Sequence, residues 1–375
     1  MPKLVLFCHS LRSDWNHGNA HFLRGLLSEC FRRGIDVTAM EPADCWSARN
    51  LVQDCGSAAL EAWRAAYPPL RVSTYDPARL DLDRALDNAD VVLVHEWNQP
   101  ELVASIARHR RLGGDYLLFF HDTHHRMASA PESLAAFDLD GFDAVLAFGD
   151  SLRQAYVRRG WGEHAYTWHE AADLALFRPR PEVPRRRALV WIGNWGDDER
   201  SAELREFLIE PVARANLSAR IHGVRYPPAA QRELARAGIE FAGYLPNFRV
   251  PEAFAEACAT VHIPRRPYAR LLPGIPTIRI FEALACGIPL VSAPWEDCEG
   301  LFRPGHDFLF AADGPAMCRH LTALREDPDL VSALATNGRA VIEARHSCAH
   351  RLDELVEICR RRGRDLSPCA AVAAE

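Results

Sequence analysis

The sequence predicts an α/β protein that contains two doubly wound domains. Short apolar runs alternate with segments of helical periodicity along the chain, which is typical of parallel strands joined by crossover helices. The pattern stops at 177–187, where three prolines and five arginines cannot enter the core of a sheet. The 375 residues are enough for two domains of ordinary size, so we expect one domain on each side of this segment.

The first half of the chain is expected to hold five strands. A helix from about Asn19 to Arg33 joins the first two, because its apolar residues recur at helical spacing and Gly34 follows as a cap. The predicted strands are Leu4–Cys8, Asp36–Ala39, Val91–His95, Tyr116–His121 and Ala144–Phe148.

The second half repeats the same pattern. Its predicted strands are Ala188–Ile192, Ala219–His222, Thr260–Ile263 and Ile288–Ala293, and its helices are Ser201–Ala215, Ala229–Ala237 and one after Gly274. We therefore expect a first domain at 1–178, a linker at 179–187, a second domain at 188–345, a C-terminal helix at 346–366 that packs toward the first domain, and a frayed tail at 367–375.

Composition narrows the classes of function. A net charge of −6 disfavours a general nucleic-acid binder. Lys3 is the only lysine, so phosphate must be bound by arginine, backbone N–H groups or neutral donors. The 11 cysteines lack paired spacing, which predicts a reduced, cytoplasmic protein. The apolar run at 4–8 is too short for a signal peptide or a membrane span, so no transmembrane segment is expected.

Polar loops follow several predicted strands, where doubly wound domains bind their ligands. The first loop, 9–19, joins the first strand to the first helix. Its residues combine hydrogen-bonding groups with an indole, which suits a sugar, and a capping loop is the alternative. The acceptor-side candidates are Asp14, Trp15, Asn16 and Gly18, and His17 is a catalytic candidate.

Two more loops of the first half carry groups for acid–base chemistry. Glu96 lies in the loop 95–98, for which a surface loop with a packed tryptophan is the alternative. Asp122, His124 and His125 follow another strand and can act as acid, base or charge stabiliser at neutral pH. A metal site would need ligands at helix or hairpin spacing, which is not evident here, and structural histidines are the other alternative.

In the second half, the candidates point to a diphosphate. Gly193, Asn194 and Trp195 follow a strand and are expected to contact the ligand, whereas the acidic residues 197–199 are expected to cap a helix. Arg265 and Arg266 follow another strand and are the best cations to neutralise a diphosphate, with a solvated charge pair as the alternative.

The stretch 273–295 is the most informative one. A turn enters an amphipathic helix, and free N–H groups at such a helix start attract phosphate. The turn residues expected to hold phosphate are Gly274, Ile275, Pro276 and Thr277. In the helix, Glu282 is expected to accept hydrogen bonds from ribose hydroxyls and Arg279 to assist donor binding, whereas a salt bridge between these two residues is the alternative.

Several segments resemble a known family. Residues 243–264, 281–293 and 327–339 resemble the nucleotide-sugar domain of group 1 glycosyltransferases, and 169–179 resembles the crossing into their linker. Residues 13–25 and 122–126 resemble the spore-maturation, CgeB-like branch. The resemblance spans most of the chain. It implies the GT-B fold, in which two Rossmann-like domains face each other across a cleft, and a bacterial enzyme that moves a sugar from a UDP- or dTDP-linked donor to an acceptor.

The resemblance also implies details of mechanism. Such enzymes usually retain the anomeric configuration and need neither metal nor cofactor, and Tyr244 is expected near the base. The family commonly shows Glu-x7-Glu; Glu282 matches the second position, but Gly274 stands at the first. A sugar-nucleotide epimerase and a catalytically degenerate nucleotide- or glycan-binding protein of envelope or spore-coat assembly are the alternatives. The acceptor (a small molecule, a glycan or a protein) and a homodimer are left open.

Overall fold

The computed structural model describes residues 1–367 and divides the chain into two compact units. The first unit comprises Met1–His169 and the segment from Cys348 on, and the second comprises Glu170–Ser347. The first crossing therefore lies about nine residues before the predicted boundary at 178, because Ala172 and Phe177 are already buried in the second unit. The predicted tail at 367–375 lies, apart from its first residue, outside the described residues.

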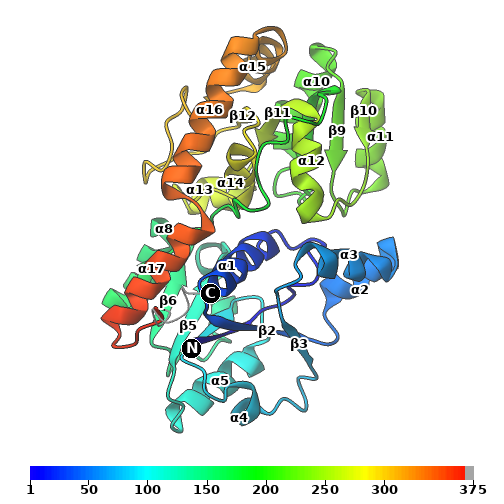
Figure 1. Ribbon diagram of the computed structural model, residues 1–375. Helices are drawn as coiled ribbons and strands as arrows, with labels where there is room; N and C mark the ends of the chain where they lie inside the picture. Colours follow the sequence, from blue (N-terminus) through cyan, green and yellow to red (C-terminus); the bar gives the residue numbers. More distant parts are fainter. Residues whose placement is uncertain (368–375) are drawn as a thin grey trace, which may run out of the picture. The chain divides into compact units, whose positions relative to one another are not determined.

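The first unit contains a seven-stranded parallel sheet in the order β3-β2-β1-β4-β5-β6-β7 (Figure 1). The order reverses between β1 and β4, which places a ligand crevice at their carboxyl ends. Both strands are buried on both faces, which explains their continuous apolar sequence. The strands are β1 (Lys3–Phe7), β2 (Asp36–Pro42), β3 (Val72–Tyr75), β4 (Val91–His95), β5 (Leu117–Asp122), β6 (Ala144–Ala147) and β7 (Ala165–Thr167).

Helices complete the first unit. The predicted first helix forms as α1, and the predicted C-terminal helix forms as α17, which packs on α1 through the guanidinium of Arg33, bonded to Asp353 and to the carbonyl of Ala349. The α-helices are α1 (Ala20–Arg32), α2 (Trp46–Cys55), α3 (Ala58–Ala66), α4 (Leu82–Ala85), α5 (Pro100–Arg111), α6 (Arg126–Ser129), α7 (Pro131–Leu134), α8 (Asp150–Tyr156) and α17 (Cys348–Arg361).

The second unit contains a six-stranded parallel sheet in the order β10-β9-β8-β11-β12-β13. Its order reverses between β8 and β11, so the crevice of this unit is expected at the carboxyl ends of those two strands. The strands are β8 (Arg187–Ile192), β9 (Ala219–His222), β10 (Ile239–Phe241), β11 (Ala257–His262), β12 (Leu290–Ser292) and β13 (Leu309–Phe310).

Helices flank this second sheet (Figure 1). The predicted helix 201–215 forms as α9, a π-helical turn at Arg205–Ile209 and α10 in succession. The α-helices are α9 (Ser201–Leu204), α10 (Glu210–Arg214), α11 (Pro228–Arg236), α12 (Val250–Ala255), α13 (Arg266–Leu271), α14 (Ile278–Ala285), α15 (Gly314–Glu326) and α16 (Pro328–Arg345). None of the helices within 1–367 combines the length and apolar character needed to cross a membrane.

Candidate functional site

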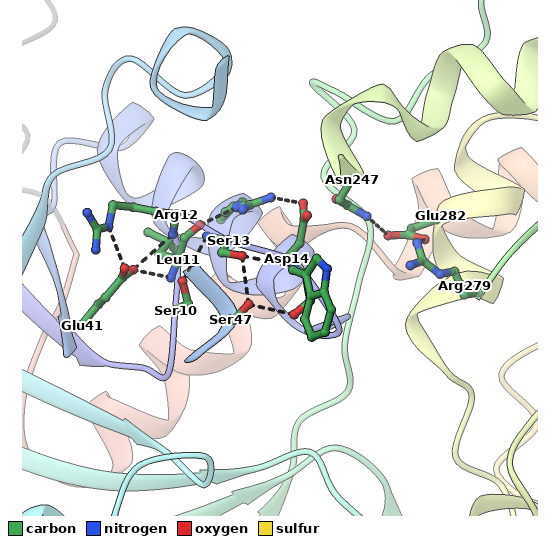
Figure 2. A network of polar contacts seen from close by, with 12 residues as sticks. Ser10, Leu11, Arg12, Ser13, Asp14, Glu41, Ser47, Asn247, Arg279 and Glu282 are labelled. Carbon is green, nitrogen blue, oxygen red and sulfur yellow. Dashed lines mark hydrogen bonds and ion pairs between the residues drawn. The ribbon is translucent and has the colours of Figure 1, made fainter. Parts of the chain in front are cut away.

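The loop after β1 is held rigidly by one buried carboxylate. Glu41, at the end of β2, is fully buried and accepts hydrogen bonds from the backbone N–H of Leu11 at 2.8 Å and of Arg12 at 3.2 Å (Figure 2). The Arg12 side chain completes the pair, with Nε 2.6 Å from Glu41 Oε1. Because a buried carboxylate with several donors fixes the backbone around it, the loop is preorganised.

The side chains of two expected acceptor-side residues stabilise this loop. Asp14 pairs with the buried guanidinium of Arg24 at 2.7 Å, and Arg24 also donates to the carbonyl of Leu11. Trp15 is buried, and its Nε1 donates to Asp54 at 2.7 Å. These contacts give Asp14 and Trp15 a structural role in the first unit. Gly18, by contrast, is exposed, and Asn16 next to Trp15 is half-buried.

Two buried carboxyl groups meet at the carboxyl ends of β4 and β5. Glu96 accepts from Thr123 Oγ1 at 3.2 Å and pairs with Arg126; burial and the nearby Asp122 raise its pKa to about 8. Asp122 accepts from the N–H of His124 at 2.9 Å and from the Tyr156 hydroxyl at 2.7 Å, and burial raises its pKa to about 6. The pair therefore holds a proton near neutral pH, as proton transfer requires.

Histidine rings line the same edge of the sheet. The His17 ring centroid lies 5.6 Å from that of His9 and 6.0 Å from that of His95, and His95 lies 5.2 Å from His121. Burial lowers the pKa of all four, to about 4 for His9 and about 3 for His121. These rings are therefore neutral at physiological pH. His17 is available as a neutral hydrogen-bonding group and not as a cation.

The two adjacent histidines predicted for catalysis lie together. The rings of His124 and His125 are 4.1 Å apart, and His125 Nδ1 is 2.8 Å from Ser129 Oγ. His124 also contacts the Trp97 ring at 5.0 Å. Within 1–367, no group of three or more His, Cys, Asp or Glu side chains has an arrangement that could hold a metal ion.

In the second unit, Arg200 is the central residue of the candidate site, although it is not among the residues predicted from the sequence. Its Nη1 donates to the carbonyl of Ile263 at 3.2 Å and its Nη2 to that of Asn194, and its guanidinium lies 5.1 Å from the ring centroid of Trp191. These contacts hold the cation at the carboxyl ends of β8 and β11, where the sheet order reverses. Arg200 is the first arginine after the strand at 188–192, and this position in the sequence could have identified it as a candidate for anion binding.

Glu199 lies near enough to favour the charged form of Arg200, but its ion pair is with Arg265. No carboxylate in 1–367 forms an ion pair with it, and burial together with the positive charge of Arg265 lowers its pKa to about 10. Arg279 acts in the same direction, so the positive charges of Arg265 and Arg279 both lower the pKa of Arg200. A half-buried cation without a counter-ion is suited to an anionic ligand.

Glycine is required beside this arginine. Gly196 has a φ of +93°, and a Cβ there would lie 2.8 Å from Arg200 Cγ and 2.9 Å from Arg200 Nε. Gly193 leaves no room either, because its Cβ would lie 2.7 Å from the Trp191 ring. Both glycines therefore serve to seat Arg200 and Trp191.

Asn194 and its neighbours tie together the loops after β8 and β9. Asn194 Oδ1 accepts from the N–H of Val224 at 3.0 Å, and the Gly193 carbonyl accepts from the Tyr226 hydroxyl at 2.8 Å. Trp195 is buried against Tyr226. These contacts fix the positions of Gly193, Asn194 and Trp195, and their role in donor binding stays a prediction.

The two adjacent arginines after β11 have different surroundings. Arg265 Nη1 pairs with Glu199 at 2.9 Å, and the side chain is half-buried. Arg266 is surrounded by the acidic segment: its Nε lies 3.0 Å from Glu203 Oε1 and its Nη2 donates to the Asp198 carbonyl. Arg265 thus lies in the arginine cluster, whereas Arg266 stabilises the loop before α9.

The turn 274–277 does not offer the free amides that the sequence analysis expected. The N–H of Gly274 donates to the Glu296 carbonyl at 2.8 Å, and that of Ile275 to the Leu272 carbonyl at 3.4 Å. Ile275 is buried, and Pro276 has no N–H. Both amides are thus already hydrogen-bonded within the protein, that of Gly274 by the loop after β12 and that of Ile275 by Leu272 just before the turn, so phosphate binding by this turn stays a prediction. Thr277 remains as the half-buried N-cap of α14.

A carboxyl group of the protein occupies the start of α14 instead. Glu170 accepts a hydrogen bond from the N–H of Ile278, the first residue of that helix, and is only 3% exposed. Its Oε1 atom is buried and has no hydrogen-bond partner within 1–367. Burial and the neighbouring Glu282 raise its pKa to about 8. This position is one that an anion would otherwise favour.

Glu282 lies in a buried polar network one turn further along (Figure 2). It is fully buried, accepts from Asn247 Nδ2 at 2.7 Å and pairs with Arg279 three residues before it. The salt-bridge alternative for these two residues therefore forms. Tyr244 precedes this network in the chain and is half-buried after Gly243, whose carbonyl accepts from the N–H of Gly223 at 2.8 Å.

Comparisons with known proteins agree with the fold. Residues 200–357, most of the second unit, match the model of a family described as glycosyl transferase-like. Among curated proteins, no sequence matches significantly. HepE of Anabaena in complex with UDP and glucose has a TM-score of 0.65 and 16% identity, over 96% of this chain and 100% of HepE.

Two further structures extend the comparison. Sucrose-phosphate synthase from Thermosynechococcus elongatus has a TM-score of 0.63 and 15% identity, over 97% of this chain and 99% of that chain. The T4 phage enzyme BGT in complex with UDP and Mn²⁺ has a TM-score of 0.60 and 12% identity, over 96% and 99%. Likeness at these identities establishes the fold: the predicted α/β class with two Rossmann-like domains of the GT-B type is confirmed. The CgeB-like branch stays a prediction.

Proposed function

We propose that this protein is a glycosyltransferase that moves a sugar from a UDP- or dTDP-linked donor to an acceptor. The observation that carries the proposal is Arg200, a half-buried cation without a carboxylate partner at the point where the second sheet reverses its strand order. Arg265 and Arg279 lie close enough to lower its pKa. The glycosyl transferase-like match of 200–357 begins at Arg200 and includes all three arginines.

The chemistry follows from the charge that develops during transfer. When the glycosidic bond to the diphosphate breaks, negative charge builds on the leaving oxygen. Guanidinium groups held before the reaction stabilise that charge without reorganising, and removing one such donor typically costs about 10²–10³-fold in rate. Arg200 is held by two backbone carbonyls and the Trp191 ring, so it fits this role.

The nucleoside part is assigned to the network around Glu282. Here Arg279 exchanges its contact with Glu282 for the diphosphate, which leaves the carboxylate to accept hydrogen bonds from ribose hydroxyls. Asn247 remains to hold the carboxylate in place at 2.7 Å, and Tyr244 is expected near the base. Arg279 is partly exposed and can therefore turn toward the diphosphate, and the ribose hydroxyls must replace its contact with the buried Glu282, because a buried carboxylate without a partner is costly.

The first unit is assigned to the acceptor and to proton transfer. The groups are Glu96 and Asp122, which hold a proton near neutral pH, with His17, His124 and His125 as hydrogen-bonding partners. Retention is the stereochemical outcome that the resemblance implies, with a diphosphate oxygen taking the acceptor proton. Inversion would instead use Asp122 or Glu96 as base. NMR of the anomeric proton in the product decides between them.

The test is incubation with a panel of nucleotide sugars. Release of free nucleotide that depends on an acceptor supports a transferase, a new sugar nucleotide indicates an epimerase, and binding without turnover indicates a degenerate binding protein. Arg200→Ala should lower the transfer rate by about 10²-fold, whereas the exposed Arg178→Ala should not change it. We propose that no metal or cofactor is needed; loss of activity in EDTA that is restored by Mn²⁺ would refute this part.

A further inference from the structure

A cavity of about 880 Å³ lies in the second unit, at the amino ends of strands of its sheet. Its lining includes Ala257, the first residue of β11, and Ile288, which precedes β12. The first lies at the amino end of β11, whose carboxyl end holds Arg200, and the second lies before the neighbouring strand β12. The proposed donor site does not use this cavity, so the inference below is independent of the proposed function.

The interior of the cavity is mainly apolar. Phe254, Ala257 and Ile288 form its floor, all at most 4% exposed, and prolines of the segment 179–184 form a wall. A volume within about 300–1,000 Å³, with an apolar lining and few polar groups, is typical of small-molecule sites. The apolar side chains are recessed, so this surface is not suited to insertion into a flat bilayer.

Three arginines lie at this apolar surface. Arg339 is neutralised by Glu343, with 2.7 Å between Nε and Oε1. Arg180 and Arg185 form no ion pair with any residue in 1–367, and the Nε atom of Arg180 is buried without a hydrogen-bond partner. A buried donor without an acceptor costs free energy, and a ligand oxygen would recover it.

Two of the three arginines act on the same residue of the lining. Arg180 and Arg339 both lower the pKa of the buried Cys286 thiol against the effect of burial, so both guanidinium groups lie near it. Cys286 is the C-cap of α14, and cations often stabilise a helix C-terminus. Here, however, the last carbonyls of α14 already accept from the N–H groups of Cys286, Gly287 and Ile288, so the helix end does not need them.

We propose that this cavity binds a soluble amphipathic anion, a molecule with one phosphate or carboxylate group on an apolar chain. Arg180 and Arg185 bind the anionic group, and the floor around Phe254 covers the apolar part. Both features are needed together, because the cations alone would bind any anion and the floor alone any apolar molecule. The ligand would hold the segment 179–185 against the body of the second unit.

The experiment uses the full chain and isothermal titration calorimetry with dodecyl phosphate and dodecanoate below their micelle concentrations. We expect at least one of the two to bind, and dodecanol and inorganic phosphate each to bind roughly tenfold more weakly or not at all. The double variant Arg180→Ala/Arg185→Ala should weaken binding roughly tenfold or more, the loss expected for charge-assisted hydrogen bonds. Ala340→Trp, on an exposed residue of the lining, should block the cavity.

The matched control is Arg178→Ala, an exposed arginine of the same segment that does not line the cavity. Circular dichroism and UDP affinity report whether each variant remains folded. The proposal is overturned if neither amphiphile binds the native protein, if inorganic phosphate binds as tightly as dodecyl phosphate, or if the Arg178 variant weakens binding as much as the double variant. If the native protein does not bind UDP, the proposed function is refuted, whereas the proposal for this cavity is unaffected.

Discussion

The substitution Glu170→Gln tests whether the carboxyl group at the start of α14 has a raised pKa and so makes stability depend on pH. In the folded protein the pKa of Glu170 is about 8, against 4.5 for an unperturbed glutamate. Between these values the folded protein holds a proton that the unfolded chain has released. Stability therefore falls as pH rises from 4.5 to 8, and the loss is complete above that range. Glutamine is neutral throughout and its amide oxygen still accepts from the N–H of Ile278, so the variant lacks this dependence.

The magnitude follows from linkage. From pH 5.5 to the folded pKa of about 8 is roughly 2.5 units, and each unit is worth about 1.4 kcal/mol, so Glu170 costs the native protein about 3 kcal/mol over this range. The ionisation of Glu96 and Asp122 changes the unfolding free energy of the native protein and of the variant with pH in the same way. These contributions therefore cancel in the difference between the two proteins. The difference in unfolding free energy between variant and native protein should therefore shift by about 3 kcal/mol in favour of the variant by pH 8.5.

The assay must report on the second unit, because the two units need not unfold together. Hydrogen exchange of a peptide that covers 278–285, followed by mass spectrometry at pH 5.5, 7.0 and 8.5 with correction for intrinsic rates, provides this. Glu182→Gln, an exposed residue of the following segment, is the control. A second readout is UDP affinity, which should fall above pH 8 only where Glu170 can ionise. Parallel pH profiles for native protein and Glu170→Gln would refute the reasoning.

Three further substitutions address the donor side. Gly196→Ala should cost about 1–2 kcal/mol of stability, because its φ is +93° and the new Cβ meets Arg200, and should weaken UDP binding in calorimetry; unchanged affinity would argue against Arg200 as a ligand. Glu282→Ala should weaken donor binding by about 1–3 kcal/mol, the loss expected for charge-assisted hydrogen bonds, and equal affinities would reject the ribose role. Gly274→Glu restores the first carboxylate of the family's Glu-x7-Glu pattern, but it should destabilise the protein by about 1–2 kcal/mol rather than raise activity. The reason is that φ at Gly274 is +87° and the new Cβ would lie 3.3 Å from Cys298 Cβ. A urea-unfolding midpoint equal to the native one would contradict this.

Much of the fold was predictable from local pattern. Val91–His95 and Ala219–His222 form strands with the predicted bounds. The first is buried on both faces and is therefore an almost continuous apolar run, whereas the second keeps a half-buried arginine between two buried apolar residues. The edge strands β3, β7, β10 and β13 were missed. They are two to four residues long, and several of their side chains are exposed or half-buried, so no apolar run marks them.

The sequence by itself determined the alternation of strands and helices and the loops where ligand-binding groups gather, because apolar periodicity and the succession of elements along the chain are local properties. Only the tertiary structure decided which polar groups remain available. Arg265 meets Glu199 across 66 residues, Glu170 reaches the first amide of α14 across 108, and the loop after β12 satisfies the amide of Gly274. Partners so distant in the chain leave no trace in local spacing. For that reason Arg200, without a carboxylate partner, replaces the turn at 274–277 as the centre of the candidate site.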